Sequence, residues 1–269
     1  MEADNTFKPK RPIGDSVFSK AEVDIIIPFH GLYEKVYQVV ESVLLVTRSN
    51  PYRIILVDDG SPNEHFIGSF KRRKFTTHRS TKLIMMRNSE QKGFGAAART
   101  GYEASTAPWV VFLNSDCVIE DSNWLIEMGR SLINLREENV RMVSARTDNP
   151  GLTSLDLLKG DRTHKIQDVI LKEGEYLPLY CFMCHRELFP RIKGFIKEYP
   201  YGWYEDEELA YRMNRFGFKQ AISGQSWVHH EGAATIKSVW KRTPIVKEIM
   251  QANRDRCLAD LKLLYEGTK

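Results

Sequence analysis

Two β-branched apolar runs on either side of one amphipathic helical pattern constrain the fold more than any other feature of the sequence. Residues 23–29 (VDIIIPF) and 52–57 (YRIILV) are typical of buried strands, and residues 32–47 carry apolar side chains at helical spacing. A strand, a helix and a second strand of these lengths form a βαβ unit, whose crossover requires the two strands to be parallel. The sequence therefore predicts a fold that is built on a parallel sheet.

The same alternation of strand and helix patterns continues along the chain. Further strands are predicted at residues 82–86, 109–113, 140–145 and 177–183. Further helices are predicted from Ser61, where Pro62 and Glu64 complete a helix-start pattern, and over residues 95–105, 124–136, 205–216 and 238–266. Repeated units of this kind predict an α/β fold with a doubly wound, mostly parallel sheet that is flanked by helices. In such sheets, ligands bind at the carboxyl ends of the strands.

Composition and pattern divide the chain of 269 residues into one domain with two extensions. Residues 1–20 are polar and rich in Lys and Pro, which predicts a tail or a strap across the surface. Residues 21–236 form the predicted domain, and residues 237–269 form a helical extension. Within the domain the pattern is lost over residues 147–175, which predicts a long surface connection that becomes ordered on ligand binding.

Composition excludes several other classes of protein. Hydrophobic residues make up 42% and charged residues 28% of the chain, a mixture that excludes disordered and collagen-like chains. No stretch reaches the ~18 uninterrupted apolar residues of a membrane-spanning helix, and the N-terminus lacks the apolar core of a signal peptide. Four cysteines are too few for a disulfide framework, so we expect a cytoplasmic protein. The net charge of +4 permits a polyanionic partner but does not require one.

Clusters of acidic residues follow two of the predicted strands. Asp58 and Asp59 come directly after residues 52–57, where they either form a turn or accept hydrogen bonds from a nucleobase and its ribose. Asp116 follows residues 109–113, where it either turns the chain or supports a divalent ion that is bound mainly through substrate phosphates. Both positions place carboxylates where a parallel sheet binds its ligands.

Two further clusters carry histidines and carboxylates. His229 and His230 are either structural residues or metal ligands, and a histidine that joins Asp116 makes a site better suited to Mn²⁺ than to Ca²⁺. The helix dipole accounts for most of the acidic residues in the first turn of the helix predicted at 205–216. Asp206 is instead a candidate general base, because an ionised carboxylate can take a proton from a substrate hydroxyl.

These clusters and two further motifs occur in the order seen in the family 2 glycosyltransferases, which the chain resembles from about Glu22 to Thr235. The motifs are IIIP at 25–28, VDDGS at 57–61, KGFG at 92–95 with Ala98, Arg99 and Gly101 after it, LNSD at 113–116, YEDEEL at 204–209 and HEGAAT at 230–235. One such motif means little, whereas six in order are hard to obtain by chance.

The resemblance implies a GT-A fold with a Rossmann-like sheet, a nucleotide-sugar donor, a divalent metal ion (Mn²⁺ or Mg²⁺) and inversion at the anomeric carbon. It divides the domain into a nucleotide-binding half at about 21–120 and an acceptor half at about 121–236. UDP-sugars are the commonest donors in the family. We therefore expect a UDP-sugar as donor and a hydroxyl group of a glycan or another macromolecule as acceptor.

The resemblance also implies roles for single residues. Asp206 matches the catalytic base and Glu205 its acidic neighbour, while Asp116 matches the last acid of the D-x-D metal motif and His230 the metal-binding histidine. Asn114 replaces the first acid of that motif, which leaves one direct carboxylate for the metal. The residues expected to bind the nucleotide sugar are Pro28, Asp58, Asp59, Lys92, Gly93, Arg99, Asn114 and Ser115, with Asp59 contacting the base. The residues expected to contact the acceptor are Trp203, Tyr204 and His229, the last also being the alternative metal ligand.

Other functions compete with this prediction. Residues 93–98 (GFGAAA) fit the dinucleotide fingerprint of an NAD-dependent oxidoreductase, with Asp116 about 20 residues later, but residues 87–92 separate them from their strand. A sugar-nucleotide pyrophosphorylase requires a glycine-rich loop where residues 28–31 instead have the sequence PFHG. A binding module without activity would be expected to lose Asp116 or Asp206, and both are present.

The spacing of Cys181 and Cys184 is that of half a zinc site. No second pair exists in the sequence, and residues three apart on a strand face opposite sides. We therefore expect both residues to be core thiols.

The acceptor is the least constrained part of the prediction. Residues 71–74 (KRRK), with Arg79 and Lys82, form either a solvated face or a contact for an anionic acceptor such as a polysaccharide, a lipid-linked phosphate or nucleic acid. A modified base in DNA is thus a minority alternative for the acceptor. Tyr201 and Trp227, with Trp203 and Tyr204, either stack on sugar rings or belong to the core.

Overall fold

A central sheet of eight strands organises the computed structural model, which describes residues 18, 20–62, 66–72, 75, 81–151, 153, 155–232 and 246–266. The strands of the chain are β1 (Val23–Phe29), β2 (Tyr52–Asp59), β3 (Lys82–Asn88), β4 (Trp109–Leu113), β5 (Cys117–Val118), β6 (Val140–Arg146), β7 (Val169–Ile170), β8 (Cys181–His185), β9 (Lys219–Trp227) and β10 (His229–His230). The helices are α2 (Tyr33–Val46), α3 (Phe66–Arg72), α4 (Phe94–Ala104), α5 (Trp124–Asn134), the 3₁₀ turn η1 (Asp156–Leu158), α6 (Leu188–Arg191), α7 (Glu205–Arg215) and α8 (Val246–Glu266).

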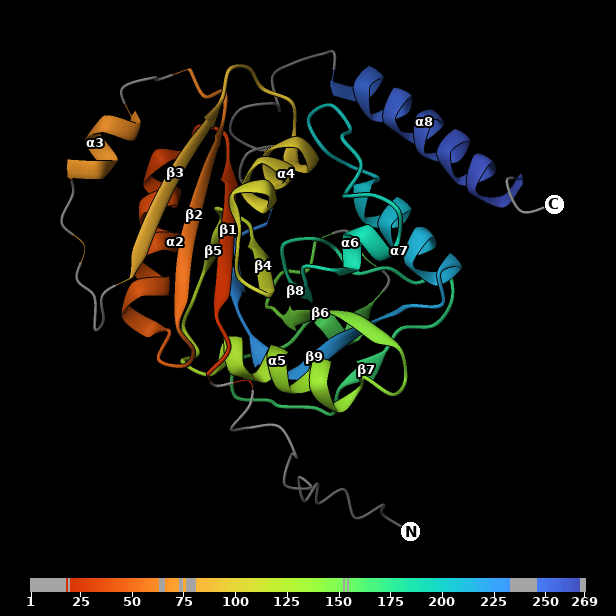
Figure 1. Cartoon of the computed structure of the whole chain (residues 1–269), viewed down its shortest axis with the longest axis horizontal. Helices are drawn as coiled ribbons and strands as arrows, with labels where there is room; N and C mark the ends of the chain where they lie inside the picture. Colours follow the sequence, from red (N-terminus) through yellow and green to blue (C-terminus); the bar gives the residue numbers. More distant parts are fainter. Residues whose placement is uncertain are drawn as a thin grey trace, which may run out of the picture.

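The order of strands in the sheet is β3-β2-β1-β4-β8-β6-β9-β7 (Figure 1). The first four strands are parallel to one another, β8 runs antiparallel between β4 and β6, and β9 is parallel to β6. This arrangement confirms the predicted mostly parallel sheet. The order reverses beside β1, because β2 and β3 lie on one side of it and β4 on the other. A reversal of this kind opens a crevice at the carboxyl ends of the strands, which is the usual ligand site of such sheets.

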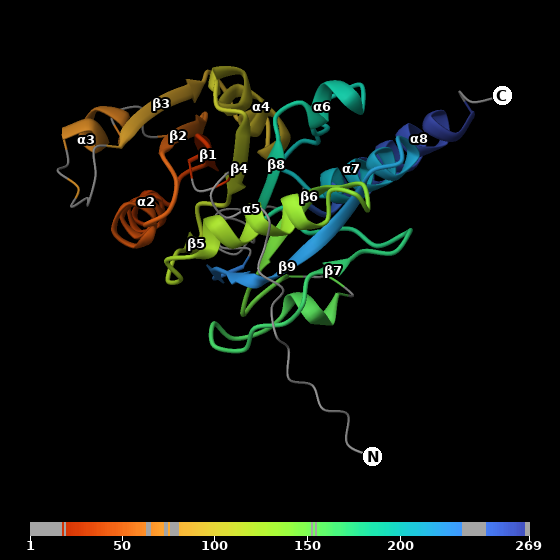
Figure 2. The same cartoon turned by 60° about the horizontal axis from the view of Figure 1, so that its bottom comes forward.

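Helices cover both faces of the sheet, as Figure 2 shows most clearly. Helices α2 and α5 belong to the hydrophobic cluster on one face, and α4 and α7 to the cluster on the other. Alternate residues of β1 enter alternate clusters: Ile25 packs on the α2 side and Ile26 on the α4 side. Cys181 and Cys184 likewise belong to opposite clusters, and both are buried and free. The expectation of core thiols is therefore confirmed.

One strand boundary differs from its prediction. The apolar run at 177–183 predicts a strand from Leu177, but β8 begins only at Cys181. Pro178 has no N–H to donate to a sheet ladder, and the Leu177 N–H instead binds the side chain of Gln220 at 2.9 Å. Leu177 is fully buried all the same, so its apolar character reflects core packing rather than strand pairing.

Most described residues of the predicted surface connection at 147–175 are exposed or half-buried, but parts of the segment are held in the fold. It contains η1 and β7, and Leu158 is completely buried. The guanidinium of Arg146, itself 4% exposed, donates to the carbonyls of Leu157, Lys159 and His164 at 2.6–3.0 Å. These bonds join residues far apart in sequence, and periodicity carries no signal for them.

Several predictions fall wholly or partly on residues that the structure does not describe. They are most of the tail at 1–20, the helix start at 61–64, most of the basic stretch at 71–79, the end of the motif at 230–235 and the first part of the helix at 238–266. Phe18 is described and lies in the core, with its ring edge-on to Trp109 at 5.6 Å, so the tail prediction is wrong at that residue.

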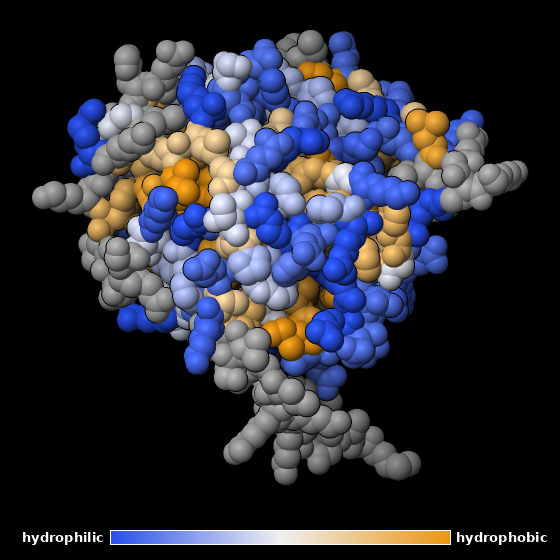
Figure 3. All heavy atoms as spheres, in the orientation of Figure 1, coloured by the Kyte–Doolittle hydropathy of each residue, from blue (hydrophilic) through white to orange (hydrophobic). Residues whose placement is uncertain are grey.

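The described helices include none that is long and apolar enough to cross a membrane. On the face shown in Figure 3, hydrophobic residues form separate small areas within a mainly hydrophilic surface. The large hydrophobic side chains that are exposed in the described part of the chain are Leu157, Leu258 and Leu263.

Candidate active site

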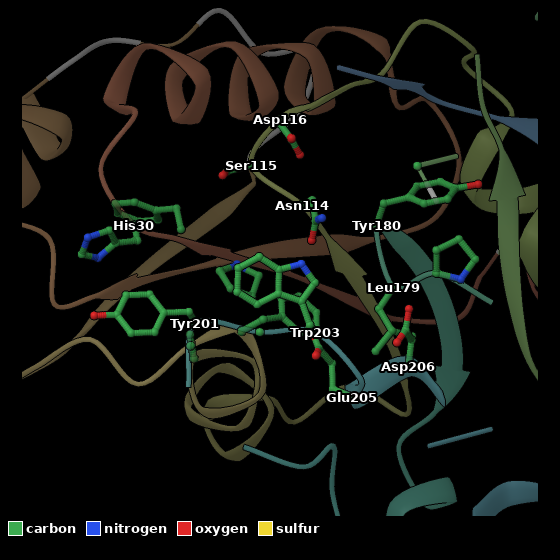
Figure 4. Close-up of a pocket in the computed structure, with 18 of the residues that line it drawn as sticks. His30, Asn114, Ser115, Asp116, Leu179, Tyr180, Tyr201, Trp203, Glu205 and Asp206 are labelled. Atoms are coloured by element: carbon green, nitrogen blue, oxygen red, sulfur yellow. The ribbon is translucent and has the colours of Figure 1, made fainter. Parts of the chain in front are cut away.

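A pocket of about 590 Å³ lies at the carboxyl ends of β1, β2 and β4 (Figure 4). The end of β1 contributes Pro28, the end of β2 contributes Asp59, and the turn after β4 contributes residues 114–116. The opposite wall comes from the loop before α7 and the first turn of that helix, which include Trp203, Glu205 and Asp206. In Figure 4, Asp116 and the Glu205–Asp206 pair lie on opposite sides of the pocket. The carboxylates that lie far apart in the sequence therefore converge on one cavity.

Asp116 and His230 face each other at one end of the pocket. His230 Nε2 lies 3.3 Å from Asp116 Oδ1, and the pairing of β5 with β10 holds the two loops together. The other ring nitrogen, Nδ1, is 2.7 Å from the carbonyl oxygen of Asn149 and donates its hydrogen there. Tyr180 stacks on the imidazole with ring centroids 4.9 Å apart. Because Nδ1 donates to Asn149, Nε2 is the ring atom that faces Asp116.

These contacts fit the requirements of a metal ligand. His230 Nε2 is buried, and beside the Asp116 carboxylate at 3.3 Å it has no hydrogen-bond partner in the described part of the chain, so a cation between the two residues would satisfy both. A metal-binding histidine typically donates its second N–H to a carbonyl or carboxylate, as His230 does to Asn149. Burial alone would lower the pKa of His230, but the neighbouring Asp116 carboxylate raises it, and the net pKa lies above its ordinary value. An imidazole nitrogen and a carboxylate oxygen form a suitable donor set for Mn²⁺.

Cys117 lies in the same cluster, since its Sγ is within 4.8 Å of ligand atoms from Asp116 and His230. Its thiol is fully buried and donates to the carbonyl of Tyr180 at 3.5 Å. Burial raises the pKa of this thiol well above its ordinary value. Cys117 therefore belongs to the core beneath the site and keeps its proton.

Asp58 and Asp59 have different positions, although they are adjacent in sequence. Asp59 lines the pocket and accepts hydrogen bonds from Asn88 Nδ2 at 2.9 Å and from the N–H groups of Lys92 and Gly93, the latter at 2.7 Å. Burial raises the pKa of Asp59, and these hydrogen bonds partly offset that rise. Asp59 therefore holds the loop before α4 in place at the edge of the pocket.

Asp58 is fully buried and lies outside the pocket lining. It forms an ion pair with Arg87 and accepts the N–H of Ser61 at 2.9 Å. The Ser61 hydroxyl in turn accepts the N–H of Gly31 at 2.7 Å. Asp58 thus joins the ends of β1, β2 and β3.

Glu205 and Asp206 begin α7 and both line the pocket. Asp206 Oδ1 accepts the N–H of Glu207 at 3.0 Å, whereas Glu205 Oε2 is buried with no hydrogen-bond partner in the described part of the chain. Burial raises the pKa of Asp206 to about 6. Burial and the charge of Asp206 raise the pKa of Glu205 to about 8. Two carboxyl groups with pKa values near neutrality beside a cavity are a candidate for proton transfer.

The residues before this pair form a strained turn, here named the aromatic loop (residues 199–204, YPYGWY). Tyr201, Gly202, Trp203 and Tyr204 all have positive φ, at 63°, 104°, 73° and 72°. A left-handed conformation costs a residue other than glycine roughly 1–3 kcal/mol. Such a run of strained residues persists only where the surroundings impose it, and strain of this kind concentrates at functional sites.

Gly93 lets the loop before α4 approach the aromatic loop. A Cβ atom on Gly93 would lie 2.6 Å from the Tyr199 carbonyl oxygen and 3.0 Å from the Tyr201 nitrogen, and the φ of Gly93 is +94°. Gly95 is equally close to Lys197, at 2.2 Å from its carbonyl oxygen. The glycines of the KGFG motif therefore allow two backbone segments to pack together at the pocket wall.

The pocket lining contains ten of the residues that the sequence predicts for the site. They are Pro28, Asp59, Gly93, Asn114, Ser115, Asp116, Trp203, Glu205, Asp206 and His230. The lining does not include Asp58, Lys92, Arg99, Tyr204 or His229. Of these, Arg99 pairs with Glu198 at 2.6 Å and His229 lies 2.6 Å from Asp148. Lys92 lies 3.5 Å from Glu90.

Other lining residues were not predicted for the site. His30 Nδ1 donates to the Asp59 carbonyl at 2.8 Å, Asn149 supports His230, and Tyr180 stacks on that histidine. His30 directly follows the first predicted strand, so its position at a strand end could have predicted that it lies at the site. Asn149 lies in the irregular segment after β6, and no local pattern marks it.

The charged groups in the described lining are strongly biased toward acids. Four carboxylates (Asp59, Asp116, Glu205 and Asp206) line the pocket, together with two histidines, and the described lining includes no lysine or arginine. A cation bound among these acidic groups would favour the binding of a negatively charged ligand.

The amino-acid sequence matches the model of a known protein family. A sequence model of one family, described as glycosyl transferase family 2, matches residues 24–192. The chain belongs to glycosyl transferase family 2. The matched segment contains Asp59 and Asp116 but ends before the aromatic loop, Asp206 and His230. The GFGAAA segment at 93–98 therefore belongs to a glycosyltransferase family and is not the dinucleotide fingerprint of an NAD-dependent oxidoreductase.

Solved structures and curated proteins agree with this family and with the predicted GT-A fold. A mannosyltransferase from Pyrobaculum calidifontis, solved with GDP-Man and Mn²⁺, has a TM-score of 0.60 at 16% identity, covering 94% of this chain and 66% of its own. GalNAc-T7, solved with UDP, GalNAc and Mn²⁺, has a TM-score of 0.59 at 16% identity, covering 78% of this chain and 44% of its own. The pre-mycofactocin glycosyltransferase of Mycobacterium tuberculosis is 23% identical over 235 residues, which are 83% of this chain and 45% of that protein. The chain spans less than half the length of the curated relatives it matches.

Proposed function

We propose that this chain transfers a sugar from a UDP-sugar, bound with Mn²⁺ or Mg²⁺, to a hydroxyl group of a neutral glycan, with inversion at the anomeric carbon. The observation that carries the proposal is the convergence of Asp116 and His230 with Glu205 and Asp206 on one pocket at the reversal of strand order. Family membership supports the reaction class, and two similar structures were solved with a nucleotide or nucleotide sugar and Mn²⁺.

The acidic lining supports the metal requirement. A nucleotide diphosphate entering this pocket meets four acidic side chains and no basic side chain in the described lining, and a bound cation would compensate its charge. Asp116 Oδ1 and His230 Nε2 are the atoms that would hold such an ion. A bound Mn²⁺ or Mg²⁺ supplies positive charge to the diphosphate as the nucleotide leaves. Pro28, Asn114 and Ser115 line the same part of the pocket and are proposed to contact the nucleotide sugar.

The chain's own residues then carry the remaining chemistry. Asp206 accepts the proton of the acceptor hydroxyl, whose oxygen attacks the anomeric carbon from the side opposite the nucleotide. A single displacement of this kind inverts the configuration. Glu205 beside it raises the basicity of the pair, because two adjacent carboxylates resist a second negative charge. Trp203 provides a flat apolar surface at the acceptor side of the pocket.

A neutral acceptor fits this site better than an anionic one. The carboxylates of the lining repel a phosphate group, and Leu179, Pro178 and Trp203 offer apolar contacts next to Asp206. The basic stretch that motivated an anionic acceptor or modified DNA lies mostly outside the described residues. The DNA alternative therefore has no support from the pocket.

A thermal-shift panel tests the proposal. Ligands that bind the folded state raise the melting temperature, so UDP-, GDP- and TDP-sugars are compared with and without Mn²⁺. We expect UDP-sugars with Mn²⁺ to give the largest rise and the same sugars without metal to give little. If only GDP-sugars raise the melting temperature, the donor nucleotide is GDP and not UDP. If every nucleotide sugar raises it equally with and without metal, the proposed metal site is refuted. Release of UDP in the presence of neutral glycans then identifies the acceptor.

A further inference from the structure

The C-terminal helix α8 reaches the pocket wall through one face. Asn253, Arg256, Cys257 and Asp260 are three or four residues apart and therefore lie on the same side of the helix. All four contact the aromatic loop or the residue before it. This helix and the loop both lie beyond the segment that the family model matches.

Asn253 makes the most specific of these contacts. Its side-chain amide donates to the carbonyl of Pro200 at 2.8 Å and to the carbonyl of Gly202 at 2.7 Å, and the residue is 3% exposed. These two carbonyls flank Tyr201, the first residue of the run with positive φ. The amide therefore binds the backbone at the point where the chain adopts its strained conformation.

The neighbours of Asn253 reinforce this attachment. The Tyr199 hydroxyl donates to Asp260 Oδ2 at 3.1 Å, Arg256 donates to the Glu198 carbonyl at 3.1 Å, and the Cys257 thiol lies 3.8 Å from the Tyr204 carbonyl oxygen. The aromatic loop is thus attached to α8 along its whole length.

The side of the pocket that carries Asp59 is held by hydrogen bonds of its own. Asp59 binds the N–H groups of Lys92 and Gly93 without any contribution from α8. A change at Asn253 removes none of the hydrogen bonds of Asp59, so the Asp59 side should change less than the wall that carries Trp203 and Asp206, although Gly93 packs against the aromatic loop.

We propose that Asn253 is a positioning residue of the transferase, which fixes the left-handed turn of the aromatic loop and so sets Trp203 and Asp206 relative to the acceptor. The proposal rests on the proposed function, because it assigns the aromatic loop to the acceptor. Helix α8 lies beyond residues 24–192, which the family model matches, and it supplies the hydrogen bonds that the strained turn requires.

The test compares Asn253→Asp with Asn50→Asp in the full chain. Asn50 is a matched control: it is also 3% exposed, and its side-chain amide also donates to two backbone carbonyls, those of Phe18 and Ala21, far from the pocket. Each substitution removes both donors, so urea denaturation should show losses of stability of similar size. Hydrogen exchange by mass spectrometry then reports local opening of residues 199–206, and calorimetry reports the Kd of UDP with Mn²⁺.

We expect Asn253→Asp to accelerate exchange in residues 199–206 about tenfold, while Asn50→Asp leaves that segment unchanged. The Kd of UDP with Mn²⁺ should stay within about twofold in both variants, because the hydrogen bonds of Asp59 to Lys92 and Gly93 do not involve α8. With UDP-N-acetylglucosamine and methyl glycosides of neutral sugars, KM for the glycoside should rise about tenfold in Asn253→Asp and KM for the donor should not. Tyr199→Phe removes only the hydrogen bond from the Tyr199 hydroxyl to Asp260, so it should give a smaller change in the same direction. This variant replaces Asn253→Asp in the test if Asn253→Asp does not fold.

Equal exchange in the two asparagine variants, or a Kd for UDP weakened as much as the glycoside KM, would overturn the positioning role. If no sugar is transferred by the wild-type chain, the proposed function fails, and the exchange contrast alone decides whether Asn253 holds the loop.

Discussion

Two pairs of adjacent carboxylates, Asp58–Asp59 at the end of β2 and Glu205–Asp206 at the start of α7, differ in how their oxygens are used. The first pair accepts hydrogen bonds or an ion pair from Arg87, Asn88 and several backbone N–H groups. In the second pair, Asp206 accepts the N–H of the next residue and Glu205 Oε2 has no partner in the described part of the chain. The first pair therefore maintains the shape of the pocket, and the second remains available for a substrate and a proton.

The largest expected effect tests the availability of Asp206. Asp206→Asn removes the group that accepts the acceptor proton, so kcat should fall about 10³-fold while the Kd of UDP with Mn²⁺ stays unchanged. Glu207→Gln changes a carboxylate in the same helical turn that does not line the pocket, and it should keep wild-type turnover. Wild-type turnover in Asp206→Asn would contradict the assignment of the base.

The next effect tests the structural use of Asp58. Asp58→Asn removes the ion pair with Arg87, which is itself partly exposed, so the free energy of unfolding should fall by about 2 kcal/mol. Urea denaturation measures this loss. A change below about 0.5 kcal/mol would show that the ion pair contributes little to the fold.

A smaller effect concerns the pH dependence of stability at Glu205. Its pKa in the folded state is about 8, above the ordinary value of 4.5, so the folded chain holds a proton that the unfolded chain has already lost. Stability is therefore lost as pH rises from about 4.5 through 8. Glu205→Gln removes this loss, so its advantage over the wild type in urea denaturation without metal should grow steadily between pH 5 and pH 9. A constant difference across this range would mean that Glu205 titrates normally.

The smallest effect concerns Arg99, which the sequence places among the donor-binding residues. In the structure Arg99 pairs with Glu198, both side chains are about 40% exposed, and neither lines the pocket. Arg99→Ala should therefore leave the Kd of UDP with Mn²⁺ within about twofold of the wild type. A loss of tenfold or more in calorimetry would return Arg99 to the donor site.

The contrast between the two pairs also shows what the sequence can predict. The strands β1 to β4 and the positions of Asp59 and Asp116 follow from short local patterns, because the end of a parallel strand is a fixed place in such a sheet. From the sequence, both Asp58 and Asp59 are expected to bind the nucleotide sugar, whereas only Asp59 lines the pocket, because adjacent residues of a strand point to opposite faces.

The acceptor side could not be predicted in the same way. The left-handed turn at Tyr201–Tyr204 depends on Asn253, which lies about 50 residues later, and on space left by Gly93, about 100 residues earlier. The support of His230 by Asn149 likewise joins two irregular segments. Contacts of this kind leave no periodicity in the sequence, so only the folded chain brings them together.

The central claim is that Asp116 and His230 hold a divalent ion on a nucleotide diphosphate in this pocket. A crystal structure of the chain with UDP and Mn²⁺, recorded with the anomalous signal of manganese, tests it directly. We expect one manganese peak at about 2.0–2.2 Å from a carboxylate oxygen of Asp116 and from His230 Nε2, with UDP phosphate oxygens on the same ion. Manganese bound elsewhere, or UDP bound in this pocket without contact to either residue, would contradict it.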